Sequence, residues 1–257
     1  LLALQKNAMA ASFGITRVSF NPSDSNTLAT TGPKFFKLWR YADGQLKVWN
    51  VNLHKGREHQ GYTDHCWLPG DDRVAACTDQ GEILIAEKGE LKTVLASAAA
   101  AGAARLLCLA PFARGFLAAG EGGVICVFEA AKEDVKDLYQ LSHSFPCAQA
   151  ERGLVASHAA GAGGGEAKAL TITSLSATPS EELLYVATAN SQLASFPLAN
   201  IDILKADEHH FAFFASGGFH HAAITGIDVC VRKPLLITCG ADKTLRMWNY
   251  ATKTCEQ

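Results

Sequence analysis

The fold is decided by residues 224–250, which read ITGIDVCVRKPLLITCGADKTLRMWNY. This stretch contains three short apolar runs separated by turns rich in Gly, Pro and Asp: Ile224–Val231, Leu235–Gly240 and Thr244–Tyr250. Short runs of β-branched and aromatic residues bounded by such punctuation are typical of strands. The stretch therefore predicts three antiparallel strands joined by tight turns.

The same order of strands and turns recurs elsewhere in the chain. It returns clearly at Ile15–Pro22, Thr27–Gly32 and Phe35–Tyr41, with Gln45–Trp49 as a fourth strand. It returns more weakly in three further segments: Arg73–Leu95, Arg105–Phe128 and Leu170–Phe196. Long runs of helical periodicity are scarce, so the chain is predicted to be all-β.

The spacing of the repeats identifies their architecture. The residues at the second turn are Pro33, Asp79, Glu121, Asn190 and Asp242, with spacings of 46, 42, 69 and 52. A period of roughly 40–45 residues is that of a four-stranded propeller blade. The long step contains the Ala/Gly-rich segment 148–169, which we interpret as a flexible insertion. We therefore expect about five four-stranded antiparallel blades, cut from a longer chain and part of one or two tandem propellers.

The composition excludes several classes of function. The 23 Lys and Arg residues against 25 Asp and Glu residues give a net charge of −2, which provides no basic field for nucleic acid. The alanine-rich stretch Val94–Ala113 is interrupted by Arg105 and Pro111 and does not predict a membrane span. The eight cysteines form no Cys-x-x-Cys pair, so we interpret most of them as small core residues with free thiols and not as metal ligands.

The last unit resembles a WD repeat. The residues that carry this resemblance are Phe219-His220, Ile224, Ile227, Leu236–Gly240, Asp242–Thr244 and Leu245–Asn249, with Trp-Asn in place of Trp-Asp. The resemblance implies a hydrogen-bonded structural tetrad of His, Ser or Thr, Asp and Trp, and by position it assigns His220, Thr238, Asp242 and Trp248. The other four units lack Asp and Trp together at the matching positions.

A histidine, a hydroxyl and an aspartate also suggest a nucleophilic triad. A catalytic hydroxyl is exposed on a strained turn beside an oxyanion hole, whereas Thr238 lies within an apolar run. The glycines of 120–123 and 161–165 lack the context of a phosphate-binding loop. The adjacent pairs His209-His210 and His220-His221 point to opposite faces of an extended chain, which suits no shared metal. We predict no catalytic, cofactor or metal site.

Longer stretches resemble the ciliary WD-repeat family of the motile axoneme: Val18–Pro22, Thr31-Gly32, Phe36–Arg40, His65–Leu68, Asp72–Val74, Thr78–Leu84, Ile172–Leu175, Pro179–Glu182 and His220–Tyr250. This resemblance implies a non-enzymatic scaffold in the cilium or flagellum. Its expected partners are inner dynein arm components, doublet-microtubule tubulin and neighbouring linker or regulatory complexes, with oligomerisation through a coiled coil outside this segment.

The same resemblance divides the chain. Residues 1–219 are expected to form later blades of a first propeller, and residues 220–257 the opening blade of a second propeller or the next blade of the same ring. Two rival functions remain open: an adaptor in a cytosolic trafficking or ubiquitin-ligase complex, and a propeller enzyme with convergent residues in its channel.

Overall fold

The structure is a computed structural model of the 257-residue chain. It describes residues 14–49, 51–53, 57, 60–70, 72–96, 105–131, 138–147, 171–189, 191–202, 211–213, 219–220 and 222–256. The predicted insertion at 148–169, the turn residue Asn190 and the histidines at 209, 210 and 221 lie outside these ranges. Within them, the expected all-β fold is confirmed, with one short 3-10 helix, η1 (Leu198–Asn200).

Five sheets of four strands follow one another along the chain, each in simple sequential order. Blade 1 contains β1 (Arg17–Asn21), β2 (Asp24–Gly32), β3 (Phe35–Ala42) and β4 (Gln45–Trp49). Blade 2 contains β5 (Tyr62–Trp67), β6 (Arg73–Thr78), β7 (Ile83–Glu87) and β8 (Glu90–Leu95). Blade 3 contains β9 (Leu106–Phe112), β10 (Gly115–Gly120), β11 (Val124–Ala130) and β12 (Tyr139–Pro146). Blade 4 contains β13 (Ile172–Ala177), β14 (Leu183–Thr188), β15 (Leu193–Pro197) and β16 (Ala212–Phe213). Blade 5 contains β17 (Ile224–Val229), β18 (Leu235–Gly240), β19 (Leu245–Asn249) and β20 (Thr254–Cys255).

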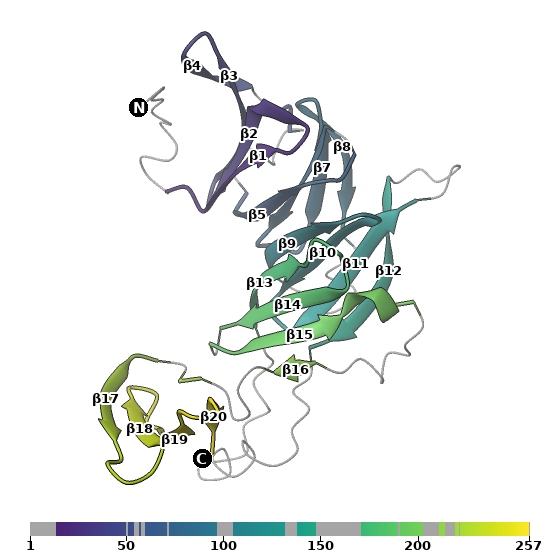
Figure 1. The fold of residues 1–257 in the computed structure, drawn as a ribbon. Coiled ribbons are helices and arrows are strands. Elements are labelled where there is room, and N and C mark those ends of the chain that lie inside the picture. Colours follow the sequence, from purple (N-terminus) through teal and green to yellow (C-terminus); the bar gives the residue numbers. More distant parts are fainter. Residues whose placement is uncertain are drawn as a thin grey trace.

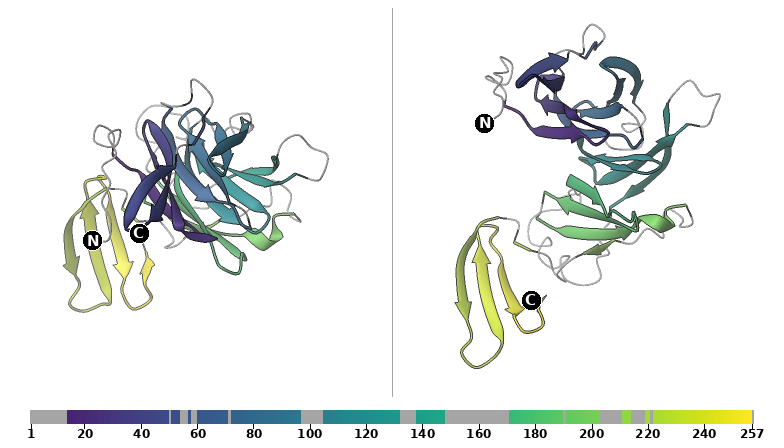
Figure 2. Two further views of the ribbon diagram at one scale, coloured as in Figure 1. Left: turned by 90° about the horizontal axis from the view of Figure 1, so that it is seen from above. Right: turned by 45° about the horizontal axis from the view of Figure 1, so that its top comes forward.

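The first four blades form a curved row. All strand pairs are antiparallel, and the first strands β1, β5, β9 and β13 contact one another in sequence along the row. Figures 1 and 2 show blades 1 to 4 stacked side by side, with blade 5 set apart at the far end. The arrangement is an open arc of propeller blades.

Each blade has two faces because successive side chains of a strand point to opposite sides. We call the side that packs on the following blade the trailing face, as with Ala29 and Leu38 of blade 1. The opposite side is the leading face, as with Val74 and Leu84 of blade 2, which join Ala29 and Leu38 in one buried cluster. Two further clusters join blade 2 to blade 3 and blade 3 to blade 4. Burial of apolar faces between consecutive blades therefore holds the row together.

A polar node on β5 reinforces the contact between three blades. The Asp64 carboxylate receives hydrogen bonds from the backbone N–H groups of Leu109 in blade 3 (2.8 Å) and of His65 (2.8 Å), and it lies 3.1 Å from Nε of Arg17 in blade 1. The His65 imidazole contacts two hydroxyls of blade 1: Nε2 lies 2.8 Å from Oγ of Ser19, and Nδ1 lies 2.9 Å from Oγ1 of Thr31.

Burial sets the titration of this node. Desolvation, with a smaller contribution from Arg17, lowers the pKa of His65 from 6.5 to about 3. Desolvation also raises the pKa of Asp64 above its usual 3.8, against the opposing effects of the Leu109 N–H and Arg17. His65 is therefore neutral in the folded protein at pH 7 and is sensitive to acid.

The first prediction concerns His65→Gln in the intact protein. Between pH 6.5 and about 3 the unfolded chain holds a proton on His65 that the native chain does not. The His65 contribution to stability is therefore present above pH 6.5 and is lost as the pH falls toward 3, at up to about 1.4 kcal/mol per pH unit. We expect the variant to be less stable at pH 7.5, with a deficit that shrinks on acidification.

Denaturant titrations of both proteins between pH 7.5 and 5 measure this difference. Asp64, whose pKa is raised, contributes a slope of the opposite sign, and because both proteins contain Asp64 this slope is common to both curves. A deficit that stays constant with pH would contradict the assignment of this proton to His65.

Candidate functional site

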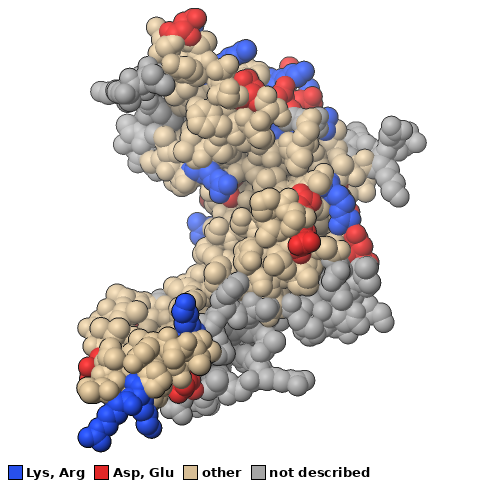
Figure 3. Space-filling view, viewed as in Figure 1, with Lys and Arg blue, Asp and Glu red and all other residues tan. Residues whose placement is uncertain are grey.

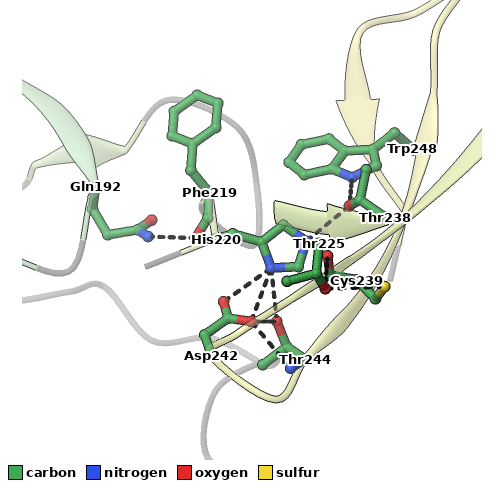
Figure 4. Close-up of polar contacts among 9 residues, drawn as sticks. All are labelled: Gln192, Phe219, His220, Thr225, Thr238, Cys239, Asp242, Thr244 and Trp248. Atoms are coloured by element: carbon green, nitrogen blue, oxygen red, sulfur yellow. Dashed lines mark hydrogen bonds and ion pairs between the residues drawn. The ribbon is translucent and has the colours of Figure 1, made fainter. Parts of the chain in front are cut away.

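The four residues assigned to the tetrad lie together in blade 5 (Figure 4). The buried imidazole of His220, which precedes β17, has Nδ1 at 3.0 and 2.9 Å from the two Asp242 carboxylate oxygens. Its Nε2 lies 2.8 Å from Oγ1 of Thr238 on β18, and Nε1 of Trp248 on β19 donates to the same hydroxyl at 2.8 Å. The chain of contacts thus runs from the β18–β19 turn across to β19.

One assignment of protons satisfies every contact in this chain. Trp248 can only donate, so the Thr238 oxygen accepts that bond and its hydroxyl hydrogen is free to point at His220 Nε2. Nε2 is then the acceptor of a neutral imidazole, and Nδ1–H donates to the Asp242 carboxylate. The hydroxyl of Thr238 is therefore bonded on both sides within the sheet.

The β18–β19 turn is built around the Asp242 carboxylate. Oδ1 of Asp242 also accepts bonds from the backbone N–H of Thr244 (3.1 Å) and from its hydroxyl (2.9 Å). Gly240 makes room for this cluster, because a Cβ at that position would lie 2.7 Å from both Asp242 Oδ1 and His220 Nδ1. A side chain at position 240 is therefore incompatible with the tetrad in its present geometry.

Blade 1 contains half of the same arrangement. Nε1 of Trp39 donates to Oγ1 of Thr30 at 2.8 Å, which repeats the bond between Trp248 and Thr238. Pro33 occupies the turn position of Asp242, so the carboxylate is absent there.

Blades 2 and 4 close the corresponding turn with a threonine. Oγ1 of Thr78 accepts from the N–H of Glu82 (3.2 Å), and Oγ1 of Thr188 accepts from the N–H of Gln192 (3.2 Å). Neither threonine was predicted to have a structural role. The repeated spacing Thr-x-x-x-Glu or Gln is the signal that could have identified them.

The remaining candidate residues can also be placed. The cysteines are free, and six are buried: Cys66, Cys77, Cys108, Cys126, Cys147 and Cys255. Burial raises the pKa of the thiols of Cys66, Cys77, Cys108, Cys126 and Cys147, which keeps them as unreactive core residues. Cys230 is not a core residue, because it lies exposed beside the β17–β18 turn. Within the described ranges no cluster of ligands could hold a metal, and no helix could cross a bilayer.

Both faces of blade 5 expose apolar side chains. Cross-strand register places Ile227 and Trp248 on the leading face with Thr238, and Ile237 and Leu245 on the trailing face. Ile227 is 66% exposed and Leu245 is 69% exposed. Single exposed apolar residues are ordinary, but apolar groups on both sides of one sheet are typical of a surface that binds another protein element.

The second prediction tests the role of the tetrad through Thr238→Val. Valine has nearly the same shape but leaves Trp248 Nε1 and His220 Nε2 without a partner, which should lower the free energy of unfolding by ~1–3 kcal/mol. The matched control is Thr225→Val in the same blade, where the lost hydroxyl is exposed. Thermal unfolding of the intact protein measures both changes. Equal stability of the two variants would contradict a structural role for Thr238.

Comparisons with known proteins agree with this geometry. The family described as WD domain, G-beta repeat matches residues 213–249. Cilia- and flagella-associated protein 57 of Mus musculus is 26% identical over 94% of this chain and 22% of its own length. Cilia- and flagella-associated protein 57 A of Tetrahymena thermophila is 32% identical over 94% of this chain and 18% of its own length.

The solved β-propeller domain of Cps50 (Swd1) from Myceliophteria thermophila matches this chain with a TM-score of 0.57 and 13% sequence identity. The match covers 91% of this chain and 70% of the solved chain, and this likeness shows the fold alone. The chain spans about a fifth of the length of the curated relatives. Their names agree with the predicted location in the cilium or flagellum. The chain is thus a series of β-propeller blades that includes a WD-repeat match at residues 213–249, and it is similar over 94% of its length to curated proteins named as cilia- and flagella-associated.

Proposed function

We propose that the chain is a non-catalytic scaffold module of the motile-cilium axoneme. In this proposal its blades dock on doublet microtubules and help to anchor or regulate inner dynein arms. The partners are inner dynein arm components, tubulin and neighbouring linker or regulatory complexes. The observation that carries the proposal is the similarity to ciliary proteins over 94% of the chain.

The arrangement of the blades supports a scaffold role. The interior is used for packing between sheets, and loops positioned on a rigid framework are the common location of binding residues. The His–Thr–Asp chain does not resemble a hydrolytic site. Thr238 is only 5% exposed, and its hydroxyl is already hydrogen-bonded to both His220 and Trp248. A nucleophile must reach a substrate carbonyl beside donors for the oxyanion.

We further propose that residues 220–257 open a second propeller. The trailing faces of blades 1 to 3 contribute apolar residues to buried clusters. Register places a mixed polar and apolar set on the trailing face of blade 4, the face that a next blade in the same ring would cover: Ser174, Ser176, Leu183, Tyr185, Ala187, Leu193, Ser195 and Pro197. The apolar leading face of blade 5, with Ile227 and Trp248, is a poor match for that surface.

The third prediction tests this division with the two variants described above. Separate domains of one chain commonly unfold in separate transitions. In the intact protein, His65→Gln should shift one thermal transition and Thr238→Val a different one, as measured by calorimetry. A shift of the same transition by both variants would place all five blades in a single cooperative ring.

The fourth prediction concerns location and partners. Crosslinking mass spectrometry on intact axonemes should recover crosslinks from exposed lysines of this chain, such as Lys47, Lys88 and Lys243, to tubulin and inner dynein arm proteins. Salt-extracted axonemes that have lost the protein are the control. Crosslinks confined to trafficking or ubiquitin-ligase components would overturn the proposal in favour of the cytosolic adaptor.

A further inference from the structure

Two turns meet at one edge of blade 5. Residues 230–234 join β17 to β18, and residues 250–253 join β19 to β20. The N–H of Tyr250 donates to the carbonyl oxygen of Pro234 at 3.0 Å, which holds the two turns together. This edge lies at the opposite end of β18 and β19 from the turn that contains Asp242.

This edge concentrates positive charge and apolar surface. We call it the basic rim, made up of Val231, Arg232, Lys233, Tyr250 and Lys253. All five residues are exposed, Val231 fully and Tyr250 by 50%. The two turns contain three cations and no carboxylate. The three cations form no ion pair or side-chain hydrogen bond with another described residue. Figure 3 shows Lys and Arg side chains projecting from the free end of blade 5.

The equivalent turn of blade 4 has the opposite charge. The two turns are closed by the same backbone bond, because the N–H of Thr178 donates to Leu183 O at 2.9 Å as the N–H of Cys230 donates to Leu235 O at 2.8 Å. Aligned on these bonds, Lys233 corresponds to Glu181. The Glu181 carboxylate accepts a hydrogen bond from the N–H of Ala113 in blade 3, so the turn of blade 4 is already in contact with a neighbouring blade. The equivalent turns of blades 4 and 5 therefore carry opposite charges.

The rest of the chain does not share this charge. Residues 224–256 contain five Lys or Arg and three Asp or Glu, and one of the three is the buried Asp242. The remainder contains 18 Lys or Arg and 22 Asp or Glu. A local excess of one sign in a chain of opposite net charge orients a charged partner toward that site.

We propose that the basic rim binds an acidic, glutamate- or aspartate-rich peptide segment of a partner protein. Arg232, Lys233 and Lys253 would pair with successive carboxylates. Val231 and Tyr250 would supply apolar contacts between the charges, because a tyrosine ring offers contact area at low entropic cost. The inference rests on the proposed function in that it takes a protein as the partner, and it specifies the chemistry of that partner.

The fifth prediction is a direct binding measurement with a fluorescently labelled glutamate-rich peptide and the intact protein. We expect binding that weakens as salt is raised, because exposed charges are screened beyond about 10 Å at 0.1 M ionic strength. R232E/K233E should weaken binding by about tenfold or more, and R232Q/K233Q by an intermediate factor. The control K47E/K88E makes the same change in net charge at exposed lysines of blades 1 and 2 and should stay within about twofold of the unaltered protein.

Several outcomes would overturn the proposal. These are the absence of binding at low salt, an equal loss in R232E/K233E and K47E/K88E, or tighter binding to a single-stranded oligonucleotide or to anionic vesicles than to the peptide. Unchanged melting of all variants shows that the comparison reports binding and not unfolding. The peptide assay uses no axonemes, so its failure would overturn the basic rim as a binding site without testing the axonemal location. The crosslinking experiment tests that location and does not test the peptide site.

Discussion

A β-sheet with two apolar faces must cover both of them, and this requirement governs every level of the structure. Blades 2 and 3 meet it fully, because each lies between two neighbours and contributes to two buried clusters. Blade 1 meets it on its trailing face, while Val18 and Phe20 on its leading side are more than half exposed. Blade 5 leaves apolar residues exposed on both sides. The uncovered apolar faces of blades 1 and 5 therefore indicate where further elements pack in the assembled protein.

Two buried histidines are used in different ways within this architecture. His65 links neighbouring blades through the hydroxyls of Ser19 and Thr31. His220 instead organises a single blade, where it connects the turn at Asp242 to the strand at Thr238. Both satisfy polar groups that burial would otherwise leave unpaired, a condition that holds for nearly all buried polar atoms in native proteins. Neither arrangement presents a reactive group to solvent.

Strong local signals made much of the fold predictable from sequence. Blade 5 follows directly from its apolar runs, and β4 begins and ends at the predicted residues, Gln45 and Trp49. Other strands were missed for physical reasons. β5 carries Thr63, Asp64 and His65, whose polarity conceals a strand because their partners are supplied by neighbouring blades. β16 is only two residues long and has no pattern to detect. The four tetrad residues could be assigned by position, whereas the Asp64 and His65 node depends on contacts that no spacing reveals.

The dependence of each blade on its neighbours has a mechanical consequence. A force applied across blades 1 to 4 passes through their interfaces in series, so the extension of the row is the sum of the separate displacements. Apolar contacts resist separation but permit sliding, since they have no preferred direction. The hydrogen bonds of Asp64 and His65 are directional and resist shear between blades 1, 2 and 3. The joint between blades 3 and 4 combines an apolar cluster with two directional contacts at the surface, because the N–H of Ala113 donates to Glu181 and Arg114 pairs with Asp202. The directional contacts that resist shear are therefore buried between blades 1, 2 and 3, whereas those between blades 3 and 4 are exposed to water, which competes for them.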